Sequence, residues 1–193
     1  MARMAAEGTR ERILAVATRL FYDKGVRAVG MKQIIDAAGC GKNLLYGHFP
    51  SKTDLVAAYL AEFQQRREDA ALAAMGAAGD DPGAQLVALA SEVAQRAGDP
   101  GYRGCPFRNY LTEFPDHTDA PGRIGLAHLG AARARIGTLT GQLGVADPEL
   151  LADRIWLVID GLYAGATRPE AADTGTTAVR LVGELIAGAV DRP

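Results

Sequence analysis

The sequence predicts an all-α protein with a small N-terminal domain over residues 1–51 and a larger helical domain over residues 52–193. Apolar residues recur at spacings of three and four along most of the chain, which is typical of helices with one buried face. No segment shows the sustained alternation with β-branched residues that is typical of a strand. Clusters of Gly, Pro and Asp divide the chain into segments of helical length.

The first helix is expected over residues 9–24 and has its apolar residues on one face. These residues are Ile13, Leu14, Ala17, Leu20 and Phe21. Gly25 follows directly, and glycine is the residue best suited to the left-handed conformation in which many helices end. The segment therefore reads as a complete amphipathic helix with its C-terminal cap.

Residues 31–48 predict two short helices joined by a tight turn. The first has an apolar stripe formed by Ile34, Ile35 and Ala38. Gly39 supplies the positive φ that ends this helix. The second, over residues 42–48, directs Leu45 inward and carries polar residues around it. This pattern is typical of a helix-turn-helix, whose second helix lies in the major groove of DNA, so we expect the chain to bind DNA.

A long helix is expected to begin after Ser51, because Ser51 with Asp54 three residues later is a variant of the capping box. The Gly- and Pro-containing segment 76–83 ends it. The next helix ends near residues 98–101. Its apolar residues are Leu86, Val87, Leu89, Ala90 and Val93.

Four further helices complete the expected fold, over residues 105–114, 121–143, 148–167 and 174–190. Pro115 stops the first of them, and Pro121 and Pro148 stand at the starts of the second and third, where proline is favoured. Arg168 and Pro169 are expected to end the third helix, since the residue before a proline avoids helical geometry.

The N-terminal part of the chain is basic and the remainder is acidic. Residues 1–53 hold nine Lys or Arg against four Asp or Glu, a net charge of +5, and include all four lysines. The other twelve basic and nineteen acidic residues leave −7 for residues 54–193. A basic end suits contact with phosphate. Chance asymmetry between two halves is the alternative, and the adjacent helix-turn-helix favours the DNA-binding interpretation.

Three motifs together resemble the DNA-binding end of the tetracycline-repressor (TetR) family. Segment 9–25 is similar to the family's first helix, and Ala38–Gly39 matches its turn. Residues 46–52, Tyr-Gly-His-Phe-Pro-Ser-Lys, resemble the family's segment of an aromatic residue, any residue, His-Phe, any residue and Ser-Lys. The resemblance covers residues 9–60. It implies an N-terminal DNA-binding domain followed by a helical effector-binding and dimerisation domain.

The expected DNA contacts lie on and around the second helix of the helix-turn-helix. The residues expected to face base edges are Lys42, Asn43, Leu44 and Gly47. Tyr46 and His48 resemble the family's phosphate contacts, and Lys52 lies at a helix N-terminus, where phosphate is favoured. Lys32 completes the set. Gly30, Gly41 and Leu44 depart from the family, which usually has hydroxyl residues there, so up to three phosphate-binding hydroxyls are missing.

The two C-terminal helices carry more apolar surface than a small core would cover. The helix over residues 148–167 is apolar nearly all round and must be covered on two sides. We expect a homodimer through a four-helix bundle, as in TetR-like proteins. The expected interface residues are Ile155, Ile159, Leu162, Val182, Leu185 and Ile186. A purely internal core is the alternative. A dimer would bind a palindrome with half-sites about 34–36 Å apart, or a multiple of that spacing.

Aromatic residues of the body suggest a cavity for a small apolar or aromatic effector. The residues expected to line it are Tyr59, Phe63, Phe107, Tyr110, Phe114, His128, Trp156 and Tyr163. Each aromatic residue alone is more often ordinary core, so the hypothesis concerns the set. We therefore expect a ligand-responsive transcriptional repressor that binds a DNA operator as a dimer. The alternatives are an effector-free TetR-like architectural or cell-division DNA-binding protein and a helical enzyme.

Other functional classes find little support in the sequence. The motifs GxSxG, the P-loop and GxGxxG are missing, so no enzymatic activity, cofactor or metal is expected. Asp116, His117 and Asp119 offer metal-binding groups, but an exposed turn explains them more simply. Cys40 and Cys105 are expected as reduced thiols, with a redox switch as the alternative. Without an 18-residue uncharged apolar run or a leader pattern, we expect a cytoplasmic protein with no membrane partner.

Overall fold

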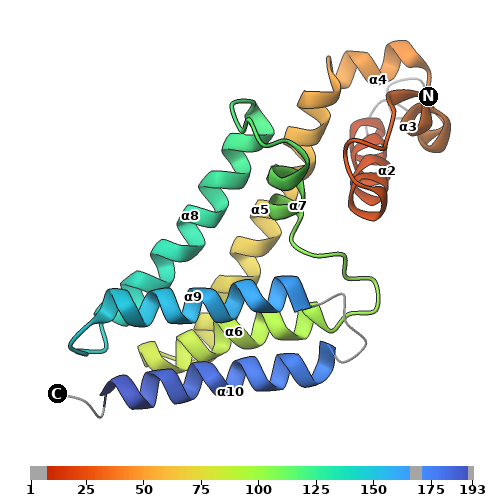
Figure 1. The fold of residues 1–193 in the computed structure, drawn as a ribbon. Helices are drawn as coiled ribbons and strands as arrows, with labels where there is room; N and C mark the ends of the chain where they lie inside the picture. Colours follow the sequence, from red (N-terminus) through yellow and green to blue (C-terminus); the bar gives the residue numbers. More distant parts are fainter. Residues whose placement is uncertain (1–7, 166–170, 191–193) are drawn as a thin grey trace. The chain divides into compact units, whose positions relative to one another are not determined.

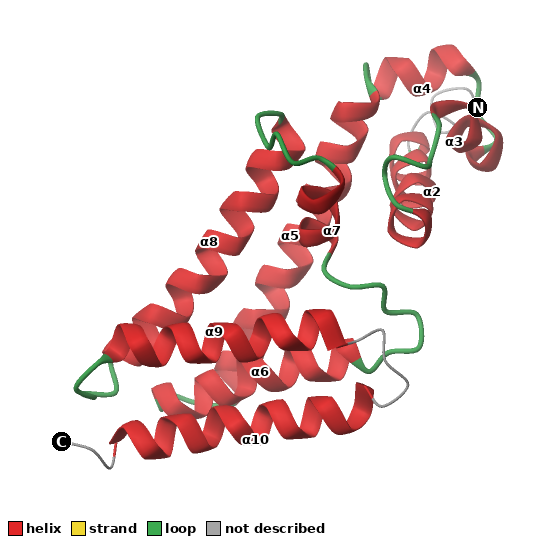
Figure 2. Ribbon diagram, in the orientation of Figure 1, coloured by secondary structure: helices red, strands yellow, loops and turns green. Residues whose placement is uncertain are grey.

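The structure is a computed structural model that describes residues 8–165 and 171–190. Within these ranges every regular element is an α-helix and none is a strand (Figure 2), which confirms the all-α prediction. The helices are α2 (Thr9–Lys24), α3 (Met31–Ala38), α4 (Lys42–His48), α5 (Lys52–Ala77), α6 (Pro82–Ala97), α7 (Pro106–Glu113), α8 (Ala120–Gly141), α9 (Pro148–Gly165) and α10 (Ala171–Val190).

The helices begin and end close to the predicted residues, because local capping sets their boundaries. Gly25 and Gly39 follow α2 and α3 with φ of +84° and +59°. The Oγ of Ser51 accepts a hydrogen bond from the N–H of Asp54 at 3.0 Å and donates to its carboxylate at 2.7 Å. The predicted capping box therefore begins α5. The helix end predicted at residues 168–169 lies outside the described residues.

The chain forms two compact units, which are described separately. The first contains the described residues up to 65 together with residues 106–128, and the second contains residues 66–105 and the described residues from 129 onward. The helices α5 and α8 contribute to both units. The first unit thus holds more than the helix-turn-helix, and the domain boundary predicted between residues 51 and 52 stays a prediction.

In the first unit, α2, α3 and α4 pack against one another (Figure 1). Their core is formed by Ile13, Ala17, Phe21, Val29, Ile34, Ala38, Leu45 and Phe49. Burial of one large apolar side chain stabilises the folded state by about 1.5–3 kcal/mol. Leu45 is completely buried, so it fixes which side of α4 faces the core and which side faces outward.

In the second unit, α6, α9 and α10 lie side by side and contact one another in pairs (Figure 1). Leu86 of α6, Ile155 of α9 and Val182 of α10 are completely buried among them. These side chains form one continuous apolar core within the protomer. None of the helices in the described ranges is long and apolar enough to cross a membrane.

Candidate functional site

The predicted recognition helix α4 exposes nearly all the side chains that were expected to contact DNA. Leu45 is its one buried residue. The exposed residues are Lys42, Asn43, Leu44, Tyr46 and Gly47. His48 is half-buried, and its Nε2 atom is buried without a hydrogen-bond partner among the described residues. That nitrogen reaches a phosphate only if the imidazole ring moves.

The basic side chains near α4 make only weak contacts within the protein. The Nζ of Lys42 lies 5.9 Å from the ring centroid of Tyr46, one helical turn away. The Nζ of Lys32 lies 2.8 Å from a carboxylate oxygen of Asp36, and both side chains are highly exposed. An exposed ion pair of this spacing contributes only about 0.3–0.5 kcal/mol. Lys32 and Lys42 can therefore exchange these contacts for phosphate or base edges at little cost.

Neither helix of the helix-turn-helix has a side-chain cap at its start. Gly30 and Gly41 are the N-cap residues of α3 and α4, both with extended backbone and no side-chain hydrogen bond. The hydroxyl groups that the family usually has at these positions are thus not replaced by another side chain of the described residues. Backbone N–H groups at both helix starts remain without a side-chain acceptor.

Lys52 is the first residue of α5 and is half-buried. Burial lowers the pKa of Lys52, whereas the negative charge of Glu113 acts in the opposite direction and raises it. Glu113 is the last residue of α7, more than sixty positions away in the chain. A lysine expected to contact phosphate is therefore held in the field of a carboxylate from another helix.

The end of α7 also holds the loop between α2 and α3. The carboxylate of Glu113 accepts hydrogen bonds from the backbone N–H groups of Val26 at 3.2 Å and Arg27 at 2.7 Å. The Arg27 side chain donates to the main-chain carbonyl of Glu113, and its guanidinium carbon lies 5.0 Å from the ring centroid of Phe114. A Cβ on Gly25 would lie 2.9 Å from the Glu113 carboxylate. The loop thus requires glycine at this position.

Sequence reasoning missed this contact between Arg27 and Glu113. The single signal in the sequence is Gly25, and helix capping alone already accounts for a glycine there. Glycine is required at position 25 for two reasons, the φ of +84° and the close approach of the Glu113 carboxylate. Nothing in the local sequence indicates which distant carboxylate makes that approach.

The residues predicted to bind an effector are divided between the two units. Six of them form three ring pairs in the first unit, and Trp156 and Tyr163 belong to the second unit. The pairs are Tyr59–Phe63, Phe107–His128 and Tyr110–Phe114, with ring centroids 5.3, 3.9 and 4.7 Å apart. Tyr59, Phe107 and Tyr110 are buried, so part of the set serves as core. Effector contact by these residues stays a prediction.

Tyr163 belongs to a half-buried polar network in the second unit. One carboxylate oxygen of Glu92 accepts from Arg67 at 2.9 Å and from Arg96 at 3.0 Å, and Arg96 also donates to the Tyr163 hydroxyl at 3.3 Å. Burial raises the pKa of Glu92 to about 7, whereas the two adjacent guanidinium groups favour its charged form. The network joins α5, α6 and α9 by polar contacts.

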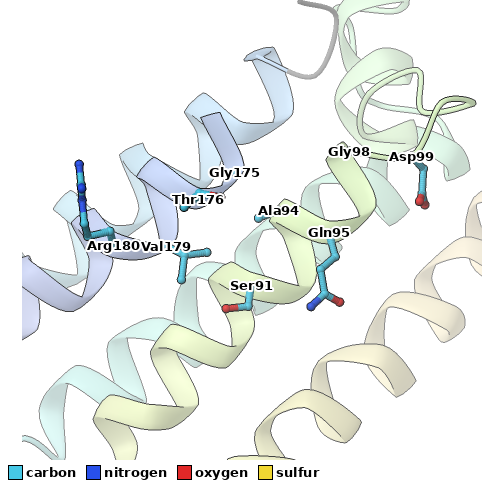
Figure 3. A pocket seen from close by; sticks show the side chains of 9 residues that line it. All are labelled: Ser91, Ala94, Gln95, Gly98, Asp99, Gly175, Thr176, Val179 and Arg180. Carbon is cyan, nitrogen blue, oxygen red and sulfur yellow. The ribbon is translucent and has the colours of Figure 1, made fainter. Parts of the chain in front are cut away.

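Two open pockets lie along α6 and α10. The larger has a volume of about 600 Å³ and combines Ser91 and Gln95 of α6, and Asp99 just after it, with Thr176 and Arg180 of α10 (Figure 3). The smaller, of about 460 Å³, lies further along the same pair of helices. None of the residues predicted to bind an effector lines either of these two pockets.

The residues predicted for the dimer interface lie at two depths. Ile155, Ile159, Leu162 and Val182 belong to the core of the second unit, and Leu185 and Ile186 are half-buried. The four core residues are therefore already covered within the protomer, because α6, α9 and α10 pack around them. The large apolar side chains that α9 and α10 expose are Leu150, Leu157, Leu181 and Val190.

The acidic turn between α7 and α8 is occupied by internal hydrogen bonds. Asp119 accepts from the Tyr110 hydroxyl at 2.5 Å and from the N–H of Gly122 at 2.8 Å. His117 pairs through Nε2 with the carbonyl of Leu111 at 3.0 Å. Across the described part of the chain, no group of three or more His, Cys, Asp or Glu residues is arranged to hold a metal ion. Neither Cys40 nor Cys105 takes part in a disulfide bond within the described residues.

Comparisons with known proteins agree with this geometry. The family model described as bacterial regulatory proteins, tetR family, matches residues 13–59. The chain is 28% identical over 171 residues to the transcriptional regulator TtgR of Pseudomonas putida, covering 81% of this chain and 79% of TtgR. It is 41% identical over 63 residues to the transcriptional activator FasR of Mycolicibacterium smegmatis, a match that spans 33% of this chain and only 27% of FasR.

A solved structure extends the likeness over nearly the whole chain. The TetR-family regulator SCO4454 of Streptomyces coelicolor has a TM-score of 0.90 and 28% identity, and the match covers 95% of this chain and 97% of SCO4454. A regulator from Chloroflexus aurantiacus, with a TM-score of 0.81 and 24% identity, shows the same fold. The helix-turn-helix of α3 and α4 and the matching family model identify residues 13–59 as a DNA-binding domain of the tetR family of bacterial regulatory proteins, and the chain as a whole shares the fold of TetR-family regulators.

Proposed function

We propose that this chain is a transcriptional repressor that binds a palindromic DNA operator as a homodimer and is released from it by a small apolar or aromatic effector. The observation that carries the proposal is the outward side of α4, which presents Lys42, Asn43 and Tyr46 with no strong partner within the protein. The net charge of +5 over residues 1–53 supports the same partner, because phosphate contacts supply most of the affinity for DNA.

The proposed DNA contacts fall into two groups. Lys42, Asn43, Leu44 and Gly47 face base edges, because all four are exposed whereas Leu45 packs into the core. Tyr46, Lys32 and Lys52 contact phosphate, and His48 joins them if its ring turns outward. Phosphate contacts set position and base contacts set sequence, so the two groups are separable by experiment.

The proposed dimer uses the exposed side of α9 and α10 rather than their buried side. Leu157 is 68% exposed, the most exposed of the large apolar residues on these helices, and Leu181 is 40% exposed. A second copy of the chain covers both, together with half-buried Leu185 of α10. Two recognition helices related by a two-fold axis then read the two halves of a palindrome.

Relatives differ in the direction of regulation. FasR is named an activator, and KstR2 of Rhodococcus jostii, 41% identical over 56 residues, is named a repressor. We assign repression, with a cytoplasmic location that follows from operator binding. The competing function, an effector-free DNA-binding protein, is favoured by the burial of Tyr59, Phe107 and Tyr110, which is typical of core residues.

Selection of bound sequences from random double-stranded DNA by the purified full-length protein tests the proposal. We expect enrichment of one palindrome, bound by a dimer with an affinity that falls steeply with salt. Lys42→Ala should weaken binding and relax the selected sequence. Binding to all sequences alike, or no binding at low salt, would refute operator recognition.

A further inference from the structure

We propose that Leu44 and Gly47 form an apolar reading face on α4, and that this face recognises the C5-methyl group of a thymine in each half of the operator. The inference rests on the proposed operator binding and adds the chemistry by which one base pair is chosen. It concerns hydrophobic contact and shape rather than hydrogen bonding.

Leu44 lies outside the buried core of its unit. Its side chain is 42% exposed, whereas the neighbouring Leu45 is completely buried and fills the core position of α4. The core beneath α4 is therefore complete without Leu44. A single exposed leucine is ordinary on a protein surface, and it gains meaning here from its position next to exposed Asn43 on the helix expected to face DNA.

Gly47 is likewise unexplained by the fold. It lies within α4 with an ordinary helical φ, and a Cβ added there would meet no atom within 4 Å. Glycine destabilises a helix relative to alanine, so the fold alone would favour alanine. Because Gly47 has no side chain, the backbone of α4 is accessible at this point, which allows close approach of another molecule.

Leu44 and Gly47 are three positions apart and are therefore neighbours on the surface of the helix. At about 100° per residue, Gly47 lies between Asn43 and Leu44, on the side opposite Leu45. Lys42 and Tyr46 form a separate pair on the other flank. The face is thus a shallow notch at Gly47, with apolar Leu44 on one edge and a polar amide on the other.

The polar and basic surroundings identify DNA as the partner that covers this face. Asn43 is exposed beside it and Lys42 is exposed on the other flank of the helix, and both carry groups that hydrogen-bond to base edges in the major groove. Leucine offers no hydrogen bond to guanine, cytosine or adenine. Thymine is the one base whose major-groove edge carries a methyl group, so it is the base that Leu44 can favour.

Single-atom changes in the operator test the contact directly. After the operator is selected with the wild-type protein, each thymine is replaced in turn by uracil, which lacks only the methyl group. We expect one thymine per half-site at which this change weakens binding by about fourfold, the worth of one buried methyl group. In Leu44→Ala the same change should have almost no effect. For the wild-type protein, 5-methylcytosine at that position should restore part of the affinity that is lost when cytosine replaces thymine.

Gly47→Ala distinguishes an effect on operator affinity from an effect on the stability of the fold. Because alanine meets no neighbour and favours helix, the variant should unfold about 2–4 °C higher than the wild type. It should nonetheless bind the operator at least several-fold more weakly. Leu72→Ala, which removes another exposed leucine from α5, is the matched control and should change neither property.

The outcomes distinguish failure of the reading face from failure of operator recognition. If no sequence is selected, operator recognition itself fails. If a palindrome is selected but no uracil replacement alters wild-type affinity, or if Leu44→Ala retains the wild-type sensitivity, the reading face is refuted while operator recognition stands. A Leu44→Ala variant that binds DNA normally and instead changes association with a protein would also overturn the inference.

Discussion

The carboxylate of Glu113 accepts a hydrogen bond from the backbone N–H of Arg27 at 2.7 Å, and the Arg27 side chain donates in return to the carbonyl of Glu113. The two residues are 86 positions apart in the chain but lie in one compact unit. Glu113 thereby joins the end of α7 to the loop that precedes the helix-turn-helix. This contact gives α7 a direct mechanical connection to the helices expected to bind DNA.

Replacing Glu113 with Ala should destabilise the protein. The change leaves the N–H groups of Val26 and Arg27 without their acceptor, and we expect the free energy of unfolding to fall by about 1–3 kcal/mol. Glu113→Gln keeps a carbonyl acceptor and should lose less. Urea unfolding followed by circular dichroism measures both. Glu184→Ala removes an exposed partner of Arg180 and should lose under about 0.5 kcal/mol. Equal losses in Glu113→Ala and Glu184→Ala would contradict the prediction.

Lys52→Ala should weaken binding to all DNA sequences by a similar factor. If its ammonium group contacts one phosphate, the slope of log affinity against log salt should become shallower by about one per half-site. Tyr46→Phe should lose a phosphate hydrogen bond of about 0.5–1.5 kcal/mol with little change in that slope. Titrations of labelled DNA at several salt concentrations give both values. Arg180→Gln, which removes an exposed charge from α10, serves as the control. An unaltered slope in Lys52→Ala would remove Lys52 from the phosphate contacts.

The helices could be predicted because their boundaries depend on neighbouring residues. Ser51 and Asp54 form their capping box within one turn, and Gly39 ends α3 by its own backbone conformation. Such signals survive in the sequence regardless of the tertiary fold. The outward side of α4 could be predicted for the same reason, since one buried leucine fixes the orientation of a seven-residue helix.

Contacts between distant segments could not be predicted in this way. Ile159 and Leu157 are both apolar residues of α9, yet the first is buried and the second is 68% exposed. Which of them faces the core depends on how α6 and α10 pack around α9. The sequence of a helix that is apolar on all sides does not indicate which side is buried. The contact between Glu113 and the Gly25 loop depends equally on tertiary packing.

Leu157→Asp should separate the dimer while leaving the protomer folded. The side chain is exposed in the protomer, so the charge stays solvated there and is buried without a partner only in the dimer. We expect a monomer by light scattering, a wild-type circular dichroism spectrum and a large loss of operator affinity. Ile159→Asp is the contrasting variant, because it places the charge in the core and should unfold the chain. A Leu157→Asp protein that remains dimeric would place the interface elsewhere.

An apolar or aromatic ligand should release the protein from its operator. The helix α5 carries Lys52 at its start and Tyr59 and Phe63 two to three turns later, so a ligand that displaces these rings also moves the start of the helix. The ligand shifts the equilibrium only through its preference for the form that does not bind DNA, and a tenfold preference is worth about 1.4 kcal/mol.

Trp156, the only tryptophan in the chain, provides a fluorescence signal for screening. By linkage, operator DNA must weaken ligand binding by the same factor by which the ligand weakens DNA binding. Phe63→Leu should reduce ligand affinity and leave the operator affinity of the free protein unchanged. A ligand that alters Trp156 fluorescence but not operator affinity would argue against the coupling and favour the effector-free function.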